Sequence, residues 1–307
     1  KENDSLYFFK RQAIFVIVGL LLLLFFTKID YHLYQKHSLK IIILATILLV
    51  LVLIPGVGIV RGGSRSWFNL GLFALQPSEI YKIALIIYVS DYISHHYHQM
   101  KKLRYCLKPL IVMGIGFFLN MILVLYGFRY IIFLGLSGIL MIILMIISAP
   151  YRMKRIFAFL DPFQDPLGSG FQMIQSLYAI GPGGILGSGF DQSIQKHFYL
   201  PEPQTDFIFA IYLEEFGFIG GILLILLYAY LFITCFNYAK KVDDLFGSFL
   251  MIGMTSMIGI QTIINLGVVV GLFPVTGVTL PLMSYGGTSL LVTLIEIGIM
   301  YNIIKSI

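Results

Sequence analysis

The sequence predicts an all-α polytopic integral membrane protein, and three observations support this fold class. Hydrophobic residues make up 58% of the chain and charged residues only 12%, and the mean hydropathy is +0.90. Apolar runs long enough to cross a hydrocarbon core of ~30 Å recur along the chain. These runs lack the alternation of barrel strands. We therefore expect helices, because lipid offers no partner to an open sheet edge.

Eight apolar segments are long enough to form membrane-spanning helices. They are 12–27, 38–55, 78–94, 108–125, 130–149, 207–237, 247–270 and 284–303. The first follows Lys10 and Arg11 and ends before Asp30, without the small residues of a signal-peptide cleavage site. We therefore expect this segment to stay in the membrane as a helix.

The net charge of +6 indicates orientation in the membrane and not nucleic-acid binding, because Lys and Arg gather in the cytoplasmic loops of membrane proteins. Three basic stretches fit such loops: 28–40, 95–108 and the pair Lys240 and Lys241. The second stretch contains three histidines without a fourth ligand at a suitable spacing. A solvated loop is therefore favoured there over a metal site.

The positions of these basic stretches constrain whether the number of membrane crossings before them is odd or even. If 28–40 lies inside and every predicted span crosses once, the long segment 150–206 also lies inside and the Lys240–Lys241 pair lies outside, against the positive-inside rule. One additional crossing near 124–129 restores agreement and puts 150–206 outside. The basic residues at 152–155 count against this arrangement. We nevertheless expect that a helix near 124–129 is omitted from the chain.

Two polar segments then share the extracytoplasmic side, and the first is the Gly-rich loop 55–79. Its glycines permit tight turns, and it holds Arg65 beside the sole tryptophan, Trp67. Pro77 and Glu79 suit the first turn of the following helix. A tryptophan anchored at the membrane interface is the simpler interpretation of Trp67, and contact with a substrate is the alternative.

The second segment, 150–206, is a large extracytoplasmic loop that we expect to be structured. Loops of this length are usually functional or disordered, and 171–180 has the apolar spacing of an amphipathic helix. Gly-rich turns follow at 181–189. Basic residues in the loop are suited to binding a diphosphate, although a charged surface helix is the alternative. These residues are Arg152, Arg155, Lys196 and His197.

Several long motifs occur in one order along nearly the whole chain. They are GGSRSWFNLG (62–71), LQPSE (75–79), SAPYRMKRIFAFLDPFQDPLGSGFQMIQSLYAIGPGGILGSG (148–189), YLPEPQTDFIFAIYLEEFGFIGG (199–221) and NLGVVVGLFPVTGVTLPLMSYGGTSLL (265–291). Together they resemble the SEDS family (shape, elongation, division and sporulation), which comprises the RodA-, FtsW- and SpoVE-type integral membrane glycosyltransferases. The SAPYRMKRI and VTLPLMSYGG stretches resemble the FtsW/SpoVE branch more than RodA.

This resemblance implies a single transmembrane domain over residues 1–307, with a fold of about ten membrane helices of which eight or nine are represented. Family members usually carry a helix upstream of the FFKRQ stretch (8–12). They also carry a Q-P-D-L-G-T-type motif followed by a helix, where this chain runs straight through LNMILVLYGFRY (119–130). The Q-P-D-L-G-T-type motif and its helix are missing at the place where the positive-inside rule requires another membrane crossing. We therefore expect that a helix is omitted there.

The resemblance also implies a function and partners. The function is polymerisation of lipid II, the undecaprenyl-diphosphate-linked disaccharide peptide, into β-1,4 glycan strands, with the active site facing the outside of the bacterial cell membrane. The implied partner is a class B penicillin-binding transpeptidase, together with other division or elongation machinery proteins. No nucleic acid is implied.

Asp206 is the residue that we expect to act as general base. A single inverting displacement needs a carboxylate to take the proton of the attacking hydroxyl, a role worth ~10²–10⁴-fold in rate, and the family's required aspartate occupies this T-D-F motif after Thr205. The alternative is that Asp206 only caps the following helix. Glu202 is expected to orient Asp206 or to share a divalent cation (Mg or Mn) with it, although no metal-ligand spacing is evident.

Two further acids, Glu214 and Glu215, follow Asp206 in the apolar segment 207–237. A straight helix over this segment would be ~46 Å long and would put both glutamates ~12–14 Å beyond Asp206, so we expect them to pair with Arg or Lys. The candidates for contacts with the diphosphate or the sugars share a basic, aromatic or hydroxyl side chain on the outer side. They are Arg65, Trp67, Arg152, Arg155, Lys196, His197 and Thr205.

Two other classes of function compete with a polymerase. A lipid II flippase should line its path with polar or ionisable groups, whereas 14–26, 41–54 and 222–234 are almost purely apolar. A non-catalytic scaffold that recruits the transpeptidase is the third class. The intact LPEPQTDF stretch (200–207) argues against the scaffold, and the acids gathered at one face argue against the flippase.

Overall fold

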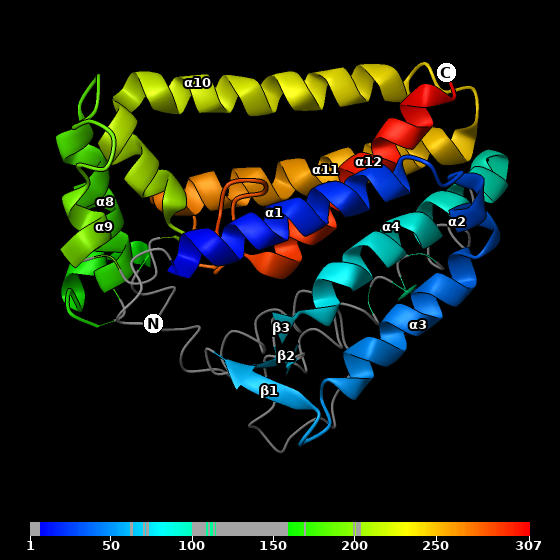
Figure 1. Ribbon diagram of the computed structural model, residues 1–307, viewed down its shortest axis with the longest axis horizontal. Helices are drawn as coiled ribbons and strands as arrows, with labels where there is room; N and C mark the ends of the chain where they lie inside the picture. Colours follow the sequence, from blue (N-terminus) through cyan, green and yellow to red (C-terminus); the bar gives the residue numbers. More distant parts are fainter. Residues whose placement is uncertain are drawn as a thin grey trace. The chain divides into compact units, whose positions relative to one another are not determined.

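The computed structural model describes most of the chain outside one long internal segment. The described residues are 7–61, 64–69, 71, 74–99, 109, 111–112, 114, 159–168, 170–198, 200 and 204–307. Helices dominate these residues (Figure 1), which confirms the predicted all-α membrane fold. The predicted span at 130–149, the additional crossing near 124–129 and most of the span at 108–125 lie outside the described residues.

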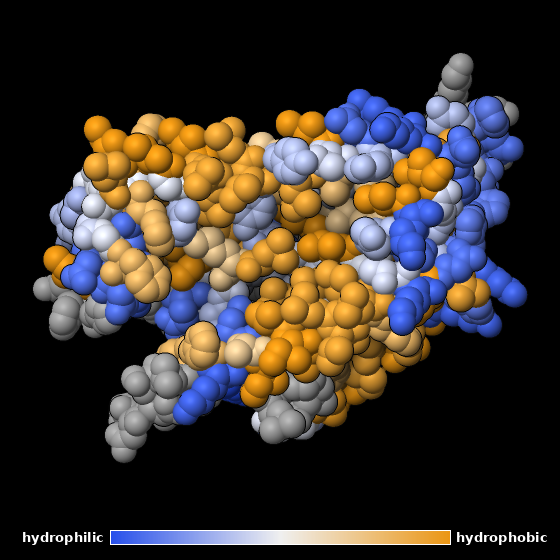
Figure 2. All heavy atoms as spheres, turned by 45° about the horizontal axis from the view of Figure 1, so that its top comes forward, coloured by the Kyte–Doolittle hydropathy of each residue, from blue (hydrophilic) through white to orange (hydrophobic). Residues whose placement is uncertain are grey.

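Six long helices coincide with predicted membrane spans. They are α1 (Tyr7–Phe26), α3 (Ser38–Leu51), α4 (Pro77–His96), α10 (Ile208–Ala239), α11 (Leu245–Val269) and α12 (Gly287–Lys305). Among the described residues, α1, α10, α11 and α12 are long and apolar enough to cross a membrane. Hydrophobic side chains accordingly cover much of the surface visible in Figure 2.

The chain divides into two compact units. The first contains Lys1–Tyr126, Tyr230–Gly259 and Tyr285–Ile307, and the second contains Gly127–Ala229 and Ile260–Ser284. The helices α10 and α11 each contribute residues to both units. The two units are described separately below.

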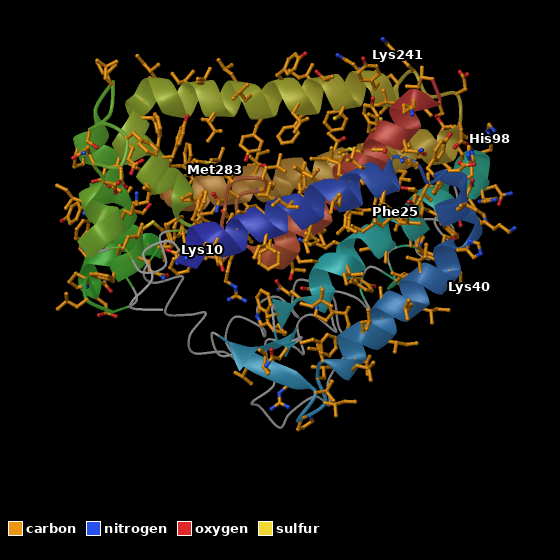
Figure 3. The ribbon with its side chains drawn as sticks, viewed as in Figure 1. Lys10, Phe25, Lys40, His98, Lys241 and Met283 are labelled. Atoms are coloured by element: carbon orange, nitrogen blue, oxygen red, sulfur yellow. The ribbon has the colours of Figure 1, made fainter. Side chains whose placement is uncertain are left out.

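In the first unit, α1 packs along α12 and α3 packs along α4. Small residues permit the first of these close approaches: a Cβ at Gly298 would lie 2.7 Å from the Leu23 carbonyl oxygen. Fully buried side chains on α11 and α12, such as Phe246, Leu250 and Ile303, fill the core. Basic and aromatic residues lie near helix ends, including Lys40 at the start of α3 and Phe25 at the end of α1 (Figure 3).

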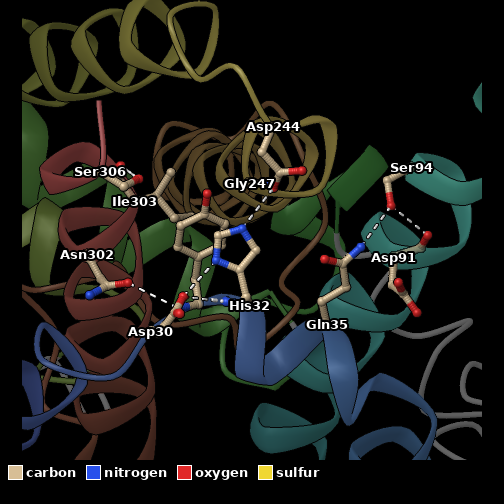
Figure 4. A network of polar contacts seen from close by, with 11 residues as sticks. Asp30, His32, Gln35, Asp91, Ser94, Asp244, Gly247, Asn302, Ile303 and Ser306 are labelled. Atoms are coloured by element: carbon tan, nitrogen blue, oxygen red, sulfur yellow. Dashed lines mark hydrogen bonds and ion pairs between the residues drawn. The ribbon is translucent and has the colours of Figure 1, made fainter.

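Polar contacts gather several turns at one end of the first unit (Figure 4). The Tyr31 backbone N–H donates to Asn302 Oδ1 at 3.1 Å, which joins the start of α2 (His32–Lys36) to α12. The His32 ring contacts Asp30 at 2.7 Å and Asp244, before α11, at 3.9 Å. The α1–α2 turn, the α10–α11 turn and the end of α12 therefore lie at the same end of this unit.

The Gly-rich loop of the first unit contains a small sheet that the sequence analysis did not predict. The strands β1 (Gly58–Arg61), β2 (Ser64–Asn69) and β3 (Ala74–Leu75) pair antiparallel in the order β1-β2-β3. These strands are too short, and too interrupted by glycine, to show a clear period of two. The Thr288 hydroxyl at the start of α12 donates to the Ala74 carbonyl at 2.9 Å, which attaches the sheet to the helical core.

The second unit contains the described part of the large loop. It comprises the 3₁₀ turn η2 (Pro162–Gln164), the helices α8 (Phe171–Gly183) and α9 (Ile194–Phe198), the first part of α10 and the end of α11. The predicted amphipathic helix at 171–180 is confirmed as α8, with Met173 and Ala179 buried. The Ser176 hydroxyl donates to the Val269 carbonyl at 2.8 Å, so α8 is fixed to the end of α11.

The expectation of a straight helix over 207–237 is wrong, because α10 bends at Gly217 (φ 65°, ψ −167°). This backbone conformation is accessible to glycine at little cost. Beyond the bend, the Phe218 and Ile219 amides donate to the carbonyls of Gly184 and Ile185, at 2.9 and 3.2 Å. The bend is therefore held by hydrogen bonds to the loop that follows α8.

Candidate functional site

Asp206 lies in the turn at 204–207 that leads directly into α10. Its side chain is half-buried, and Oδ1 accepts a hydrogen bond from the Thr205 hydroxyl at 2.7 Å. The next residue, Phe207, is fully buried and anchors the turn. The Asp206 carboxylate makes no hydrogen bond to the described amides of residues 207–210. The alternative of a simple helix cap is therefore not supported by the geometry.

Asn265 on α11 holds the backbone of Asp206 in place. Its Nδ2 donates to the Asp206 carbonyl and to the Val278 carbonyl, both at 2.7 Å. The Asn265 side chain is 1% exposed, and its buried Oδ1 has no hydrogen-bond partner among the described residues. The sequence analysis did not include Asn265 in the site. Its polar side chain within the apolar stretch of α11 was the signal that could have indicated it.

The segment after α11 passes close to Asp206. Gln261 Nε2 donates to the Thr279 carbonyl at 3.1 Å, so two amides of α11 fix this segment. A Cβ at Gly277 would lie 4.0 Å from Asp206 Oδ2. The absence of a side chain at Gly277, which has φ +76°, leaves space beside the carboxylate.

Glu214 and Glu215 have structural partners. Glu214 is 2% exposed, and its carboxylate accepts from the Ser193 hydroxyl at 2.6 Å and from the Ile194 amide at 2.9 Å. Glu215 is 6% exposed and pairs with Lys196 Nζ at 3.5 Å. The prediction of a cationic partner is therefore confirmed for Glu215 and wrong for Glu214, because the amide end of α9 supplies donors for the Glu214 carboxylate.

Lys196 on α9, predicted to contact the substrate, bridges two acids. Its Nζ pairs with Asp191 as well as with Glu215. Partial burial lowers the pKa of Lys196, but the hydrogen bond and charge of Asp191 and the charge of Glu215 outweigh burial, so the pKa is raised above its ordinary value. Its ammonium is therefore held by the protein itself.

The other predicted site residues are distributed over several places. Arg65 and Trp67 are both partly buried on β2, which belongs to the first unit. His197 lies in the short helix α9 of the second unit. The remaining three, Arg152, Arg155 and Glu202, lie outside the described residues. Over the described ranges, no group of three His, Cys, Asp or Glu side chains is placed to hold a metal ion.

Comparisons with known proteins place this arrangement in a family. A family model named for FtsW, RodA and SpoVE, and described as "Cell cycle protein", matches residues 1–307. The chain belongs to this family. It is 47% identical to "Stage V sporulation protein E" of Bacillus subtilis, over 99% of this chain and 88% of that protein. It is 42% identical to "Probable peptidoglycan glycosyltransferase FtsW" of Trichlorobacter lovleyi, over 98% and 84%.

Two solved structures have a similar fold. A chain from a structure described as "Structural coordination of polymerization and crosslinking by a peptidoglycan synthase complex" matches with a TM-score of 0.70 and 29% identity, over 98% of this chain and 90% of that chain. The rod shape determining protein RodA of Thermus thermophilus matches with a TM-score of 0.62 and 25% identity, over 99% and 89%. This FtsW/RodA/SpoVE protein is therefore a multi-pass membrane protein.

The branch of the family agrees with the sequence analysis. Identity to the sporulation protein and to FtsW is 47% and 42%, against 25% to RodA. The two alignments extend over 324 and 322 positions, which exceeds the 307 residues of this chain by 17 and 15. At least that many aligned positions of each relative therefore have no counterpart in this chain.

Proposed function

We propose that this protein is a peptidoglycan glycosyltransferase that polymerises lipid II into β-1,4 glycan strands. The names of its FtsW relatives support the activity, and the geometry of Asp206 supports a site for it. The observation that carries the proposal is a half-buried carboxylate without a capping role, fixed at its backbone by Asn265 and open beside Gly277.

In the proposed reaction, Asp206 acts as the general base. It accepts the proton of the 4-hydroxyl of one lipid-linked disaccharide while that oxygen attacks the anomeric carbon of another. The bond to undecaprenyl diphosphate breaks with its electron pair, and the α linkage of the donor becomes a β linkage. The Thr205 hydroxyl donates to Asp206 Oδ1, which leaves Oδ2, beside Gly277, as the oxygen that faces the substrate.

The leaving diphosphate requires positive charge or hydrogen-bond donors. Arg65, Arg152, Arg155 and His197 are the proposed contacts, with Trp67 beside a sugar. Lys196 is a weaker candidate than the sequence suggested, because Asp191 and Glu215 already hold its ammonium. Among the described residues, no group of three His, Cys, Asp or Glu side chains could hold a metal ion, so a divalent cation here would need Glu202 beside Asp206. No step of the proposed reaction requires one.

We also propose the orientation and the partner. The site faces the outside of the cell membrane, where the lipid-linked disaccharide is polymerised. A class B penicillin-binding transpeptidase would crosslink the product. The similar chain from a peptidoglycan synthase complex, in which polymerisation and crosslinking are coordinated, supports such a partner.

The test is a polymerisation assay with purified full-length protein, the candidate transpeptidase and lipid II. We expect glycan polymer from the wild type and a loss of ~10²–10⁴-fold in rate from Asp206→Asn. The Asp206→Asn protein should retain the wild-type melting temperature and bind the transpeptidase equally well. Equal polymer yield from Asp206→Asn would contradict the proposed base. No polymer from either protein, with the partner bound, would favour a scaffold, and transfer of labelled lipid II across vesicles would favour a flippase.

A further inference from the structure

The loop between α8 and α9 presents an unusual apolar surface. Its first seven residues, GILGSGF (184–190), include no charged side chain. The three large apolar side chains are among the most exposed in the second unit: Ile185 at 68%, Leu186 at 78% and Phe190 at 79%. A surface loop in water would normally carry polar residues at such positions.

The same loop is fixed to the bend of α10 through its backbone. Besides the bonds from Phe218 and Ile219, the Ser188 and Gly189 amides donate to the carbonyls of Glu214 and Glu215, at 2.9 and 3.0 Å. The side chains of the loop are thereby carried against α10, where the rings of Phe190 and Phe216 lie 6.3 Å apart. Figure 1 shows α8, α9 and their connecting loop beside this bend.

The exposed side chains of the loop continue into the membrane-spanning part of α10. Phe218 is 64% exposed and Ile219 54%, and one turn further Ile222 and Leu223 are 42% and 56% exposed. The segment after the bend has the composition of a membrane span, so we expect these side chains to face lipid. Ile185, Leu186, Phe190, Phe216, Phe218 and Ile219 therefore form one surface, here called the apolar lip, that is continuous with a lipid-facing helix.

The backbone of the loop is also suited to an environment poor in water. Each unpaired amide or carbonyl is costly in hydrocarbon, and the loop satisfies several of its own: the Gly187 amide donates to Gly183 at 2.7 Å, and the Gln192 amide donates to Gly189 at 3.2 Å. Charge resumes directly after the lip, where Asp191 pairs with Lys196. This order of apolar and charged residues matches a segment that enters the interface and then returns to water.

We propose that the apolar lip is immersed in the lipid bilayer, at the level where headgroups meet acyl chains, a depth of about 5–10 Å. The occupant of this surface is therefore lipid, and neither a protein partner nor a second copy of the chain. The proposal does not depend on the role of Asp206, because it concerns only where the apolar lip lies.

The experiment uses the fact that Trp67 is the sole tryptophan. In a Trp67→Phe background, Leu186→Trp places one fluorophore on the lip. Leu223→Trp on the spanning part of α10 is the lipid-facing control, and Gln164→Trp, at an exposed position between two aspartates, is the aqueous control. Each full-length variant is reconstituted into phosphatidylcholine–phosphatidylglycerol vesicles, and its melting temperature is compared with that of the background.

We expect the fluorescence of Leu186→Trp to be quenched by lipids brominated near the headgroup end of the acyl chain and to be protected from iodide. Leu223→Trp should be quenched most by more deeply brominated lipids, and Gln164→Trp by iodide alone. Quenching of Leu186→Trp by iodide alone would place the lip in water and overturn the proposal. Protection of Leu186→Trp from both quenchers would show that protein covers the lip, which also overturns it. Ile185→Trp repeats the measurement if Leu186→Trp fails to fold.

Discussion

At the scale of single residues, the acids near the start of α10 divide by their surroundings. Glu214 and Glu215 are buried and occupied by partners from the preceding loop, whereas Asp206 is half-buried and its carboxylate is bonded only to Thr205 among the described residues. The sequence indicated the importance of Asp206 through its motif. It could not show that an α11 amide holds the backbone of Asp206, because Asn265 is 59 residues away along the chain.

Replacing Asn265 should affect both stability and activity. Asn265→Ala leaves the buried carbonyls of Asp206 and Val278 without their donor, at a cost of about 1–3 kcal/mol in the free energy of unfolding. Because Asp206 then loses its fixed position, polymerisation should slow even at temperatures where the variant is folded. Thermal unfolding and the lipid II assay measure the two effects.

The matched control is Gln261→Ala, which removes an α11 amide that bonds to Thr279 but not to Asp206. We expect it to lower the melting temperature with a smaller effect on the rate. Equal losses of rate in the two variants at equal folded fraction would show that Asn265 does not position Asp206.

We expect deprotonation of Lys196 to lower the stability of the second unit at alkaline pH. Its pKa is raised in the folded state, so its contribution is fully present below the unfolded pKa of about 10.4. This contribution is lost as the pH rises through the folded pKa. We expect the melting temperature to fall more steeply above this pH in the wild type than in Lys196→Met. Parallel pH profiles of the two proteins would contradict this assignment.

At the scale of elements, the six spans that the structure describes were predictable because apolar runs of about 20 residues leave few alternatives. The amphipathic period also predicted α8. The bend in α10 was not predictable, because glycine is common in membrane helices and nothing in the EEFGF stretch distinguishes a bend from a tolerated residue. The hydrogen bonds that hold the bend are made by residues 184–189, which belong to a separate loop.

A side chain at Gly217 should be poorly tolerated. Gly217→Ala adds a Cβ only 2.3 Å from the Gly187 amide nitrogen and 2.6 Å from the Ile185 carbonyl oxygen. It also adds a cost of about 1–3 kcal/mol, because φ 65° and ψ −167° lie in a region that only glycine adopts readily. Gly184→Ala is the control, because Gly184 has φ +54° and open space around its Cβ position.

We expect Gly217→Ala to lose clearly more thermal stability than Gly184→Ala, because only Gly217 of these two combines positive φ with crowding. The difference between their melting temperatures measures how much stability depends on the close approach of α10 to the loop. Equal melting temperatures would mean that the loop does not hold the bend.

At the scale of the whole molecule, family membership follows from motifs along the entire chain, but the number of crossings does not. The turns around Asp30 and Asp244 and the end of α12 lie at one end of the first unit. The Gln35 side chain also donates to Ser94 Oγ, near the end of α4, at 3.4 Å. Because α10 crosses once, we propose an odd number of crossings between residues 97 and 207. The two predicted spans give an even number, and one additional crossing would make it odd.

Labelling in intact cells tests this proposal. In a cysteine-free background, we expect a membrane-impermeant maleimide to react with cysteine introduced at Val57 or Asp191, which we place outside. It should not react with cysteine at Asp243, which we place inside. Labelling at Val57 and Asp243 with none at Asp191 would show an even number of crossings and would leave Lys240 and Lys241 outside.

The hydrogen bonds that fix the loop of the apolar lip also limit its length. Surface loops usually accept insertions at little thermodynamic cost. Here the Gly184 carbonyl and the Gly189 amide are both bonded to α10, on either side of Gly217. A residue inserted between Gly184 and Gly189 would break one of these two hydrogen bonds or shift it to a different partner on α10. Unlike an ordinary connection, this stretch therefore cannot take an epitope tag, and it should keep a constant length as the protein evolves.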